Sequence, residues 1–369
     1  MRLDPDPSLH ARASFAEPAA IAGEWDALAA AAGTANPFYA PAGVRAGALL
    51  PEAGAPRLLI VRAPGGALAG VLPVATRRWR GIALCTENWD QRLRALGEPL
   101  IRAGDEALFW QVALPLLARA PGRWLRLSAL DADSPSTKAL EKVLAHAGRG
   151  HEVTRRYERA VLHRGLSAEE HARTHIRGKV LKEHRRLRSR LAERGALVFH
   201  RLAPDGDVAE WTDDLFRLEQ TGWKGREGVA AAADPATDAC FRRLIASAHA
   251  DGSLDFHRMT LGGQPIAMLA NLERGDEAFQ LKIAYDEDWA SFSPGVLLEM
   301  AYLEHALDVR GLARVDSCAR AGHPMIDRLW PDRRTIVSFV IPHPDPLSRT
   351  LCEGQRLWRA RRARSLEPS

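Results

Sequence analysis

Apolar side chains recur along the chain with two periods, which predict helices and strands respectively. Spacings of three and four residues predict helices at 25–32, 107–118, 136–147, 167–194, 208–220, 234–249, 296–309 and 325–330. Short apolar runs bounded by turn residues predict strands at 57–62, 68–76, 124–130, 197–202, 254–261, 265–272, 278–285, 314–317 and 335–341. Helices and strands are interleaved throughout, so we expect an α/β fold with a mixed sheet.

Both halves of the chain contain a hairpin in a similar setting. Ala63-Pro64-Gly65-Gly66 separates two strands in the first half, and Gly262-Gly263 does so in the second. Each hairpin is followed by a strand and a helix. The sequence therefore predicts two related domains, at 1–160 and 161–345, followed by a basic tail at 346–369.

Composition places the chain among globular proteins. Of 369 residues, 46% are hydrophobic and 26% are charged, and no apolar stretch approaches the ~20 residues of a bilayer span. The first residues, Met1-Arg2-Leu3-Asp4-Pro5, carry an acid and a proline where a signal peptide would have an apolar core. We therefore expect a cytoplasmic protein with no transmembrane segment.

Cysteine spacing and net charge limit the kinds of ligand that the chain is expected to bind. Cys85, Cys240, Cys318 and Cys352 are scattered, which gives no zinc or disulfide spacing, so no metal is expected. Lys and Arg number 51 against 46 for Asp and Glu. This modest excess favours an anionic partner, which could be nucleic acid, a phosphorylated cofactor or a phosphosugar.

The segment from the strand at 278–285 to the following helix is the strongest local feature. A loop of small residues opens that helix, whose free N–H groups and positive dipole end can hold a pyrophosphate or a carboxylate. The residues that would hold such a group are Ser293, Pro294, Gly295 and Val296. The competing interpretation is an ordinary cap, in which Ser293 and Pro294 simply start the helix.

These residues resemble a known family. Lys282, Tyr285-Asp286 and the Ser-Pro-Gly-x-Leu-Leu at 293–298 resemble the core of GNAT-superfamily acyltransferases of the BioF2-like or CelD-like type, relatives of the FemAB aminoacyltransferases. The resemblance covers residues 165–341 and implies two tandem GNAT-like domains and an acyl-CoA donor such as acetyl-CoA. One feature departs from it: the Arg/Gln-x-x-Gly-x-Gly/Ala signature that cradles coenzyme A is replaced by Ser-Pro-Gly.

Four residues near this loop are candidate catalytic groups. Lys282 interrupts an apolar strand, and alternation places it on the same face as Gln280 and Asp286. It could bind a substrate anion or stabilise the oxyanion of the reaction, or it could lie on a solvated face. Tyr285 and Asp286 end the strand and could transfer protons. Asp316 lies on the neighbouring strand and is the preferred general base.

Residues outside this strand are candidates for substrate binding. The basic helix contributes Arg177 and Lys179, whose cations would attract an anionic acceptor unless they form a solvated face. Trp223 and Lys224 lie in a Gly-rich loop that looks onto the acceptor pocket in the family. His323 precedes a proline and is either a base or a structural residue.

The residues and the resemblance together predict an N-acyltransferase. An amine would attack an acyl-CoA thioester directly, in a crevice between the strands that end at Asp286 and Ser317. Two alternatives remain open: a FemAB-like aminoacyl transfer from charged tRNA, and a non-catalytic GNAT-fold protein that binds a nucleotide-sugar in polysaccharide biosynthesis. The acceptor is expected to be a small-molecule or sugar-linked amine, with nucleic acid unlikely except for tRNA.

Overall fold

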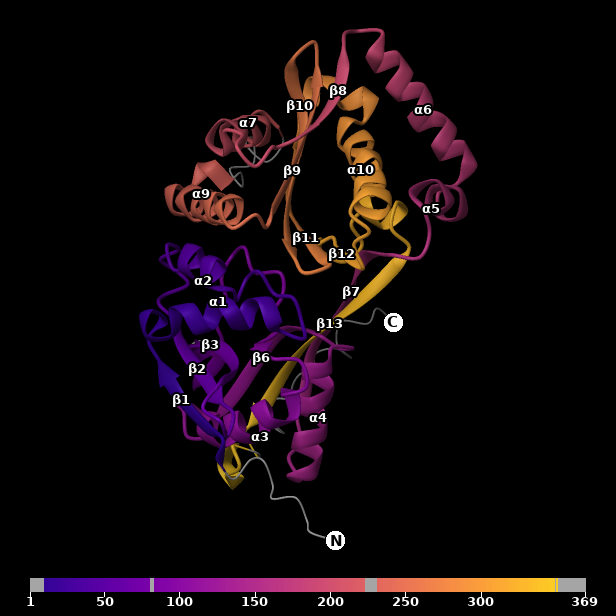
Figure 1. Cartoon of the computed structure of the whole chain (residues 1–369). Helices are drawn as coiled ribbons and strands as arrows, with labels where there is room; N and C mark the ends of the chain where they lie inside the picture. The colour runs from indigo at the N-terminus through magenta and orange to yellow at the C-terminus, as the bar shows by residue number, and fades with distance from the viewer. Residues whose placement is uncertain (1–9, 80–82, 223–230, 349, 351–369) are drawn as a thin grey trace. The chain divides into compact units, whose positions relative to one another are not determined.

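The chain forms two compact units in the computed structural model, which describes residues 10–79, 83–222, 231–348 and 350 (Figure 1). The first unit extends to residue 157, without residues 45–52, and also includes the chain from residue 335 onward. The second unit comprises residues 158–334 and residues 45–52. Within the described residues, no helix is both long enough and apolar enough to cross a bilayer.

The first unit is built from strands and helices in an interleaved order. Its elements are β1 (Arg12–Ala16), η2 (Pro18–Ile21), α1 (Ala22–Ala31), α2 (Pro41–Gly47, which runs past the limit of the unit), β2 (Arg57–Arg62), β3 (Leu68–Trp79), β4 (Ala83–Asn88), β5 (Leu100–Ile101), α3 (Glu106–Leu117), β6 (Trp124–Asp131), α4 (Pro135–His146) and the start of β7 (Glu152–His163).

The second unit continues from the end of β7. Its elements are α5 (Ala168–His175), α6 (Gly178–Ala192), β8 (Leu197–Arg201), α7 (Val208–Thr221), η3 (Ala231–Ala233), α9 (Pro235–Ala250), β9 (Leu254–Leu261), β10 (Gln264–Arg274), β11 (Glu277–Tyr285), η4 (Glu287–Phe292), α10 (Pro294–Glu304), the π-helix η5 (His305–Val309), β12 (Arg314–Asp316), η6 (Ile326–Arg328) and the first residues of β13 (Asp332–Pro342).

The two units share one strand pattern. The first has the order β1-β2-β3-β4-β6-β13, and the second has β8-β9-β10-β11-β12-β7. In both, the first three neighbouring pairs are antiparallel, the fourth is parallel and the fifth is antiparallel. The closing strand of the first unit, β13, comes from its C-terminal segment, and the closing strand of the second unit is the end of β7, where the run of that unit begins. The expected mixed α/β fold is confirmed, with two units of the same strand pattern in tandem.

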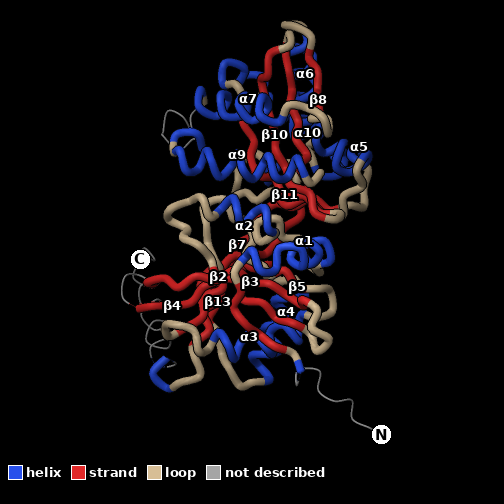
Figure 2. The backbone as a smooth tube through the Cα atoms, turned by 60° about the vertical axis from the view of Figure 1, so that its left-hand side comes forward, coloured by secondary structure: helices blue, strands red, loops and turns tan. Residues whose placement is uncertain are grey.

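Helices cover both faces of the second unit's sheet. Figure 1 shows α7 and α9 on one side of β9 and β10 and α10 on the other, and Figure 2 shows the same helices in blue against the red strands. Buried apolar residues of α10, β10 and β12 form the core under α10, which also includes Trp330. Burial of this apolar surface is the main stabilising term for such a layer.

Besides the predicted helix at 325–330, of which only the 3-10 turn η6 forms, two helices differ from the sequence-based expectation. The predicted helix at 167–194 is divided, because Ile176 and Arg177 have extended backbone between α5 and α6. Ser167 and Glu170 form a capping box that starts α5, which is the signal that the sequence does carry. The second difference is at the end of α10, where the predicted helix continues only as a π-helical turn.

Candidate active site

The open edge of β11 defines the candidate site. The parallel pairing between β11 and β12 covers only Glu277–Phe279 and Arg314–Asp316, whereas β11 continues to Tyr285. A cavity of ≈ 190 Å³ lies along the unpaired part, between Gln280–Ile283 on β11 and Ser317–Ala319 after β12. The two parallel strands therefore diverge and leave backbone groups of β11 facing a hollow, as the sequence had predicted for this crevice.

Two larger cavities are lined in part by Pro324 and Met325. One, of ≈ 890 Å³, is lined by Arg177, His184, Ser293 and Val296, among other residues. The other, of ≈ 320 Å³, is lined by Glu219, Tyr285, Glu287, Arg320 and His323. Met325 lines all three cavities. The second unit thus holds three cavities around the loop at 323–325.

A β-bulge changes which side chains of β11 share a face. Ala270 pairs with Lys282, but the next residue of β10 pairs with Gln280, so Leu281 is an extra residue in β11. Gln280 consequently points to α10, where it bonds Glu299, whereas Lys282 points to α7, where it pairs with Glu219. The expectation that Gln280 and Lys282 share a face is wrong, because a bulge reverses the alternation.

Lys282 is held in a buried ion pair. Its Nζ lies 2.6 Å from Glu219 Oε1, and the two side chains are 13% and 1% exposed. Nζ also lies 5.4 Å from the ring centre of Phe241. Glu219 lines the 320 Å³ cavity and Lys282 lines the 190 Å³ cavity. The solvated-face interpretation of Lys282 is therefore excluded, and the pair separates two of the hollows.

Glu299 of α10 is a buried acid that the sequence analysis missed. Gln280 Nε2 donates a hydrogen bond of 2.9 Å to Oε2, and Oε1 has no hydrogen-bond partner among the described residues. Burial raises the pKa of Glu299 to about 7, partly offset by the bond from Gln280. Glu299 lines the 190 Å³ cavity. A carboxyl group with these properties can exchange a proton near neutral pH. The available signal was an acid among the apolar residues Leu297, Leu298 and Met300 of the helix.

Asp316 is a structural residue, and its predicted role as general base is not supported. Its carboxylate is fully buried, and Oδ2 lies 2.6 Å from Arg159 and 2.7 Å from Arg334. Burial would raise its pKa, but the two guanidinium groups outweigh burial and lower the pKa to about 2. A carboxylate held by two cations is a very weak base. The neighbouring Cys318 thiol has a pKa raised by burial, which is unfavourable for a nucleophile.

Tyr285, Asp286 and Gly295 occupy the turn between β11 and α10. The Asp286 side chain accepts a hydrogen bond from Asp288 N–H and caps η4. Tyr285 lines the 320 Å³ cavity. A Cβ at Gly295 would lie 3.2 Å from Cδ1 of the Tyr285 ring. A side chain at Gly295 would therefore press on the Tyr285 ring, which is a packing reason for the glycine, whereas the sequence analysis assigned it to a pyrophosphate.

The 890 Å³ cavity brings together two groups that the sequence analysis had separated. Arg177, expected at the acceptor, shares this cavity with Ser293 and Val296, expected at the donor. Ser293 has φ of 52° and makes no side-chain cap. His184 also lines the cavity, and its buried Nδ1 has no partner among the described residues. This cavity therefore presents the Arg177 cation to a ligand, beside the His184 ring.

The other residues predicted to bind substrate or donor do not gather at one cavity. Lys179 is exposed on α6 and does not line these cavities. Pro294 is buried at the start of α10. His323 lines the two smaller cavities, and its Nδ1 lies 3.4 Å from Ile326 N. Trp223 and Lys224 lie outside the described residues.

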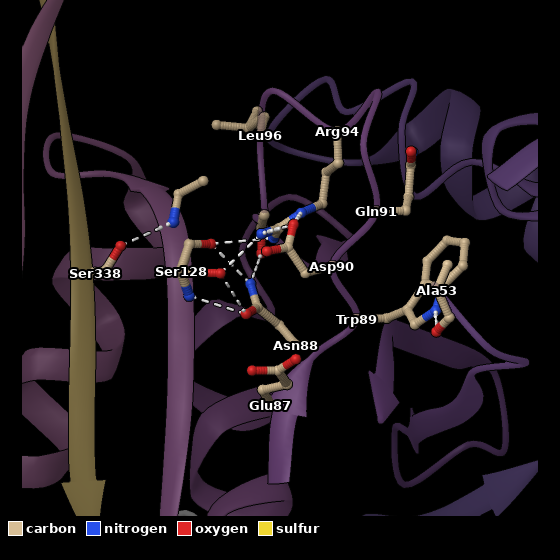
Figure 3. A network of polar contacts seen from close by, with 12 residues as sticks. Ala53, Glu87, Asn88, Trp89, Asp90, Gln91, Arg94, Leu96, Ser128 and Ser338 are labelled. Carbon is tan, nitrogen blue, oxygen red and sulfur yellow. Dashed lines mark hydrogen bonds and ion pairs between the residues drawn. The ribbon is translucent and has the colours of Figure 1, made fainter. Parts of the chain in front are cut away.

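The corresponding position in the first unit is filled by side chains (Figure 3). The parallel pairing of β4 with β6 covers Thr86 and Glu87, and the next residue, Asn88, spans the gap with its amide. Asn88 Oδ1 accepts from Ser128 N–H, and Nδ2 donates to the Ser128 carbonyl, each at 2.9 Å. Arg94, nearly fully buried, bonds both Ser128 and Asp90. These bonds fill the place that the crevice occupies in the second unit.

Comparison with known proteins agrees with this geometry. The sequence model described as an acetyltransferase (GNAT) domain matches residues 178–323, which include the whole of β11 and α10. No curated protein matches the chain significantly in sequence.

Solved structures share the fold across both units. FemX has a TM-score of 0.60 at 9% identity, with 92% of this chain and 99% of that chain covered. The C-terminal domain of a putative lysylphosphatidylglycerol synthetase from Agrobacterium fabrum has a TM-score of 0.55 at 13% identity, with 92% and 97% covered. A conserved protein of unknown function from Bacteroides thetaiotaomicron has a TM-score of 0.57 at 10% identity, with 89% and 99% covered. The predicted resemblance is confirmed: residues 178–323 match the model of a GNAT acetyltransferase domain, and the two-unit chain has the fold of FemX.

Proposed function

We propose that the chain is an N-acyltransferase that moves an acyl group from an acyl-CoA-type thioester to an amine, with the reaction in the crevice beside β11. The observation that carries this proposal is Glu299, a buried carboxyl group with one unpaired oxygen, at the open edge of a GNAT domain. The BioF2-like type remains our assignment within the superfamily.

The 890 Å³ cavity is the proposed donor site. The usual glycine-rich cradle is absent, and α10 offers few amide donors, because Pro294 has no N–H and Leu297 N–H bonds the Ser293 carbonyl. Arg177 and Arg328, which line the cavity, would supply the charge that the missing amides do not. Guanidinium groups bind phosphate oxygens in a fixed geometry, which suits the pyrophosphate of coenzyme A.

The acyl end of the donor would extend along β11. An unpaired strand edge binds extended ligands through its main-chain groups, as in strand addition. The thioester would then lie in the 190 Å³ cavity, which Glu299 and Lys282 line. The acceptor would enter from the 320 Å³ cavity, whose lining includes the Glu287 carboxylate, a group that attracts an ammonium.

The proposed chemistry is direct attack. The amine nitrogen forms a bond to the thioester carbon, the C–S bond breaks, and the thiolate leaves. Glu299 accepts the proton that the nitrogen loses, and the thiolate takes up a proton from Tyr285 or from water. No covalent enzyme intermediate forms, so Cys318 has no nucleophilic role.

Calorimetric titration with acetyl-CoA tests the donor. Binding that is weakened by Arg177→Glu, with unchanged far-UV circular dichroism, supports the proposal. Absence of binding, together with aminoacyl transfer from charged tRNA, would favour the FemAB-like alternative. Absence of both, with binding of a nucleotide-sugar, would favour the non-catalytic alternative in polysaccharide biosynthesis.

A further inference from the structure

A second polar cluster is buried in the second unit, on β9, β10 and the end of α10. It contains Asp255 and His257 on β9, Asn271 on β10, Tyr302 on α10 and His305 on η5. Asp255 and Asn271 are fully buried, and Tyr302 is 1% exposed. None of these residues lines the three cavities described above. The cluster is therefore separate from the candidate active site.

Two imidazoles and one carboxylate converge in this cluster. His257 Nε2 lies 2.9 Å from Asp255 Oδ2, and His305 Nε2 lies 3.6 Å from Asp255 Oδ1. One ligand atom from each of the three residues lies within 4.8 Å of the others. Ligands bound about 2 Å from one metal ion are themselves separated by roughly 3 to 4 Å. The spacing thus matches the edges of a coordination polyhedron.

Several polar atoms of the cluster have no hydrogen-bond partner among the described residues. These atoms are Oδ1 and Nδ2 of Asn271, the hydroxyl oxygen of Tyr302 and Nε2 of His305. Asn271 lies directly opposite Asp255 in the register of β10 and β9. An unpaired polar group in a dry interior costs folding free energy, so such groups together indicate a missing ligand.

The π-helical turn η5 carries His305. π-turns insert an extra residue into a helix and often occur at functional positions. The His305 ring lies 4.8 Å from the His257 ring, centre to centre. His305 is the residue at which α-geometry ends: its own N–H still bonds the Ala301 carbonyl as in an α-helix, and its carbonyl accepts the π-type bond from Arg310 N–H.

Two arginines at the edge of the cluster each pair with a carboxylate. Arg201 Nε donates to Asp255 Oδ1 at 2.7 Å, and Arg310 binds Glu273 at 2.6 Å. A basic group on the second oxygen of a ligating carboxylate is a common outer contact that fixes its orientation. The interior thus offers one carboxylate and two imidazoles, a donor set that suits Zn²⁺ and similar transition ions and does not suit Mg²⁺ or Ca²⁺.

We propose that Asp255, His257 and His305 bind one divalent transition-metal ion of the Zn²⁺ class, which anchors the end of α10 to β9. The Tyr302 hydroxyl and the Asn271 amide would bind the metal or a water on it. Cysteine spacing could not reveal such a site, because its ligands are histidines about fifty residues apart in sequence and one carboxylate.

Titration of the full chain, purified with a chelator and then desalted, tests this proposal. One equivalent of Zn²⁺ should bind by calorimetry, and Co²⁺ should give the visible absorption of a low-symmetry site. Mg²⁺ should do neither. Zn²⁺ at about 100 times its Kd should raise the melting temperature by roughly 5 °C or more.

Three variants locate the metal. His257→Gln and His305→Gln should each weaken Zn²⁺ binding at least tenfold and remove the Co²⁺ absorption. His200→Gln is the matched control, because His200 lies on the neighbouring strand β8 and bonds Thr260 outside the cluster; it should bind metal as the parent does. Failure of the parent chain to bind one equivalent, or equal binding by all three variants, would overturn the proposal. The parent titration decides even if a variant does not fold.

Discussion

Gln280 and Glu299 connect β11 to α10 through a hydrogen bond of 2.9 Å, which uses one oxygen of the carboxyl group and leaves the other without a partner among the described residues. The bulge at Leu281 is what turns Gln280 toward α10. This relationship fixes the carboxyl group at the edge of the crevice, and it makes Glu299 the residue on which the proposed mechanism depends.

Glu299→Gln should lower kcat by about 10² to 10⁴, the range expected when a general base is removed. Because the pKa of Glu299 is raised to about 7, the parent rate should rise with pH through that value as the carboxyl group ionises. The variant should lose this rise. Thiol release from acetyl-CoA, measured against pH with a panel of amines, checks both expectations. Gln280→Leu, which removes the bond, should shift the midpoint upward; an unchanged profile in both variants would exclude Glu299 as the base.

Glu299→Gln should lower activity but raise the free energy of unfolding at high pH. The folded pKa of about 7 exceeds the ordinary value of 4.5, so folding favours the protonated acid and loses stability as pH rises from 4.5 through 7. The cost at pH 8 is on the order of 3 kcal/mol. Urea unfolding should therefore show the variant more stable than the parent at pH 8 but not at pH 4.5. Equal stability at both pH values would mean that the carboxyl group is already solvated.

Asp316→Asn should destabilise the second unit rather than affect catalysis alone. Removing the charge leaves Arg159 and Arg334 buried around a neutral amide, which costs about 3 to 5 kcal/mol. The pKa of Asp316 is lowered to about 2, so its contribution is complete above pH 4 and is lost as pH falls toward 2. Urea unfolding at pH 7 checks the loss. Asp286→Asn, at the exposed cap of η4, should cost only a few tenths of a kcal/mol; equal effects would contradict the structural role of Asp316.

Gly295→Ala should destabilise the parent by about 1 kcal/mol, because the new Cβ presses on the Tyr285 ring. In a Tyr285→Ala background the same change should become neutral or stabilising, because alanine is the better helix former. A double-mutant cycle by urea unfolding measures this coupling. Acetyl-CoA affinity should be retained in the double variant. Loss of affinity without coupling would return Gly295 to the role of a phosphate-facing residue.

The sequence predicted the fold better than it predicted the site. The β2 and β9 boundaries are the same in sequence and structure, since turn residues and apolar runs mark them locally. The strand β7 was missed because its apolar residues, Ala160 to Leu162, occupy only its end, and the rest is polar.

The wrong predictions for the site have physical causes that cannot be seen in the alternation or composition of a single strand. The extra residue at Leu281 is a property of pairing with β10, so the faces of Gln280 and Lys282 could not be read from one strand. Asp316 was chosen as a base because it interrupts an apolar strand, but its partners Arg159 and Arg334 come from distant positions in the chain. Glu299 lies among apolar residues of a helix, and burial of that helix face is what makes its carboxyl group unusual.

Arg177→Glu should raise the KM for the donor about tenfold or more, with little change in kcat, if the 890 Å³ cavity holds the pyrophosphate. The physical reason is position: Arg177 lies at the start of α6 and lines the cavity with Ser293, whereas Arg194 lies just beyond the other end of that helix. Arg194→Glu is therefore the matched control, with the same charge change and an exposed side chain. Initial rates, measured at varied acetyl-CoA and at several salt concentrations, separate an effect on the donor KM from an effect on kcat. Salt should raise the parent's donor KM and have less effect on Arg177→Glu, because the screened attraction is already gone. Equal effects of the two reversals would show that α6 acts through its overall charge, and a change confined to the acceptor KM would move the acceptor into this cavity.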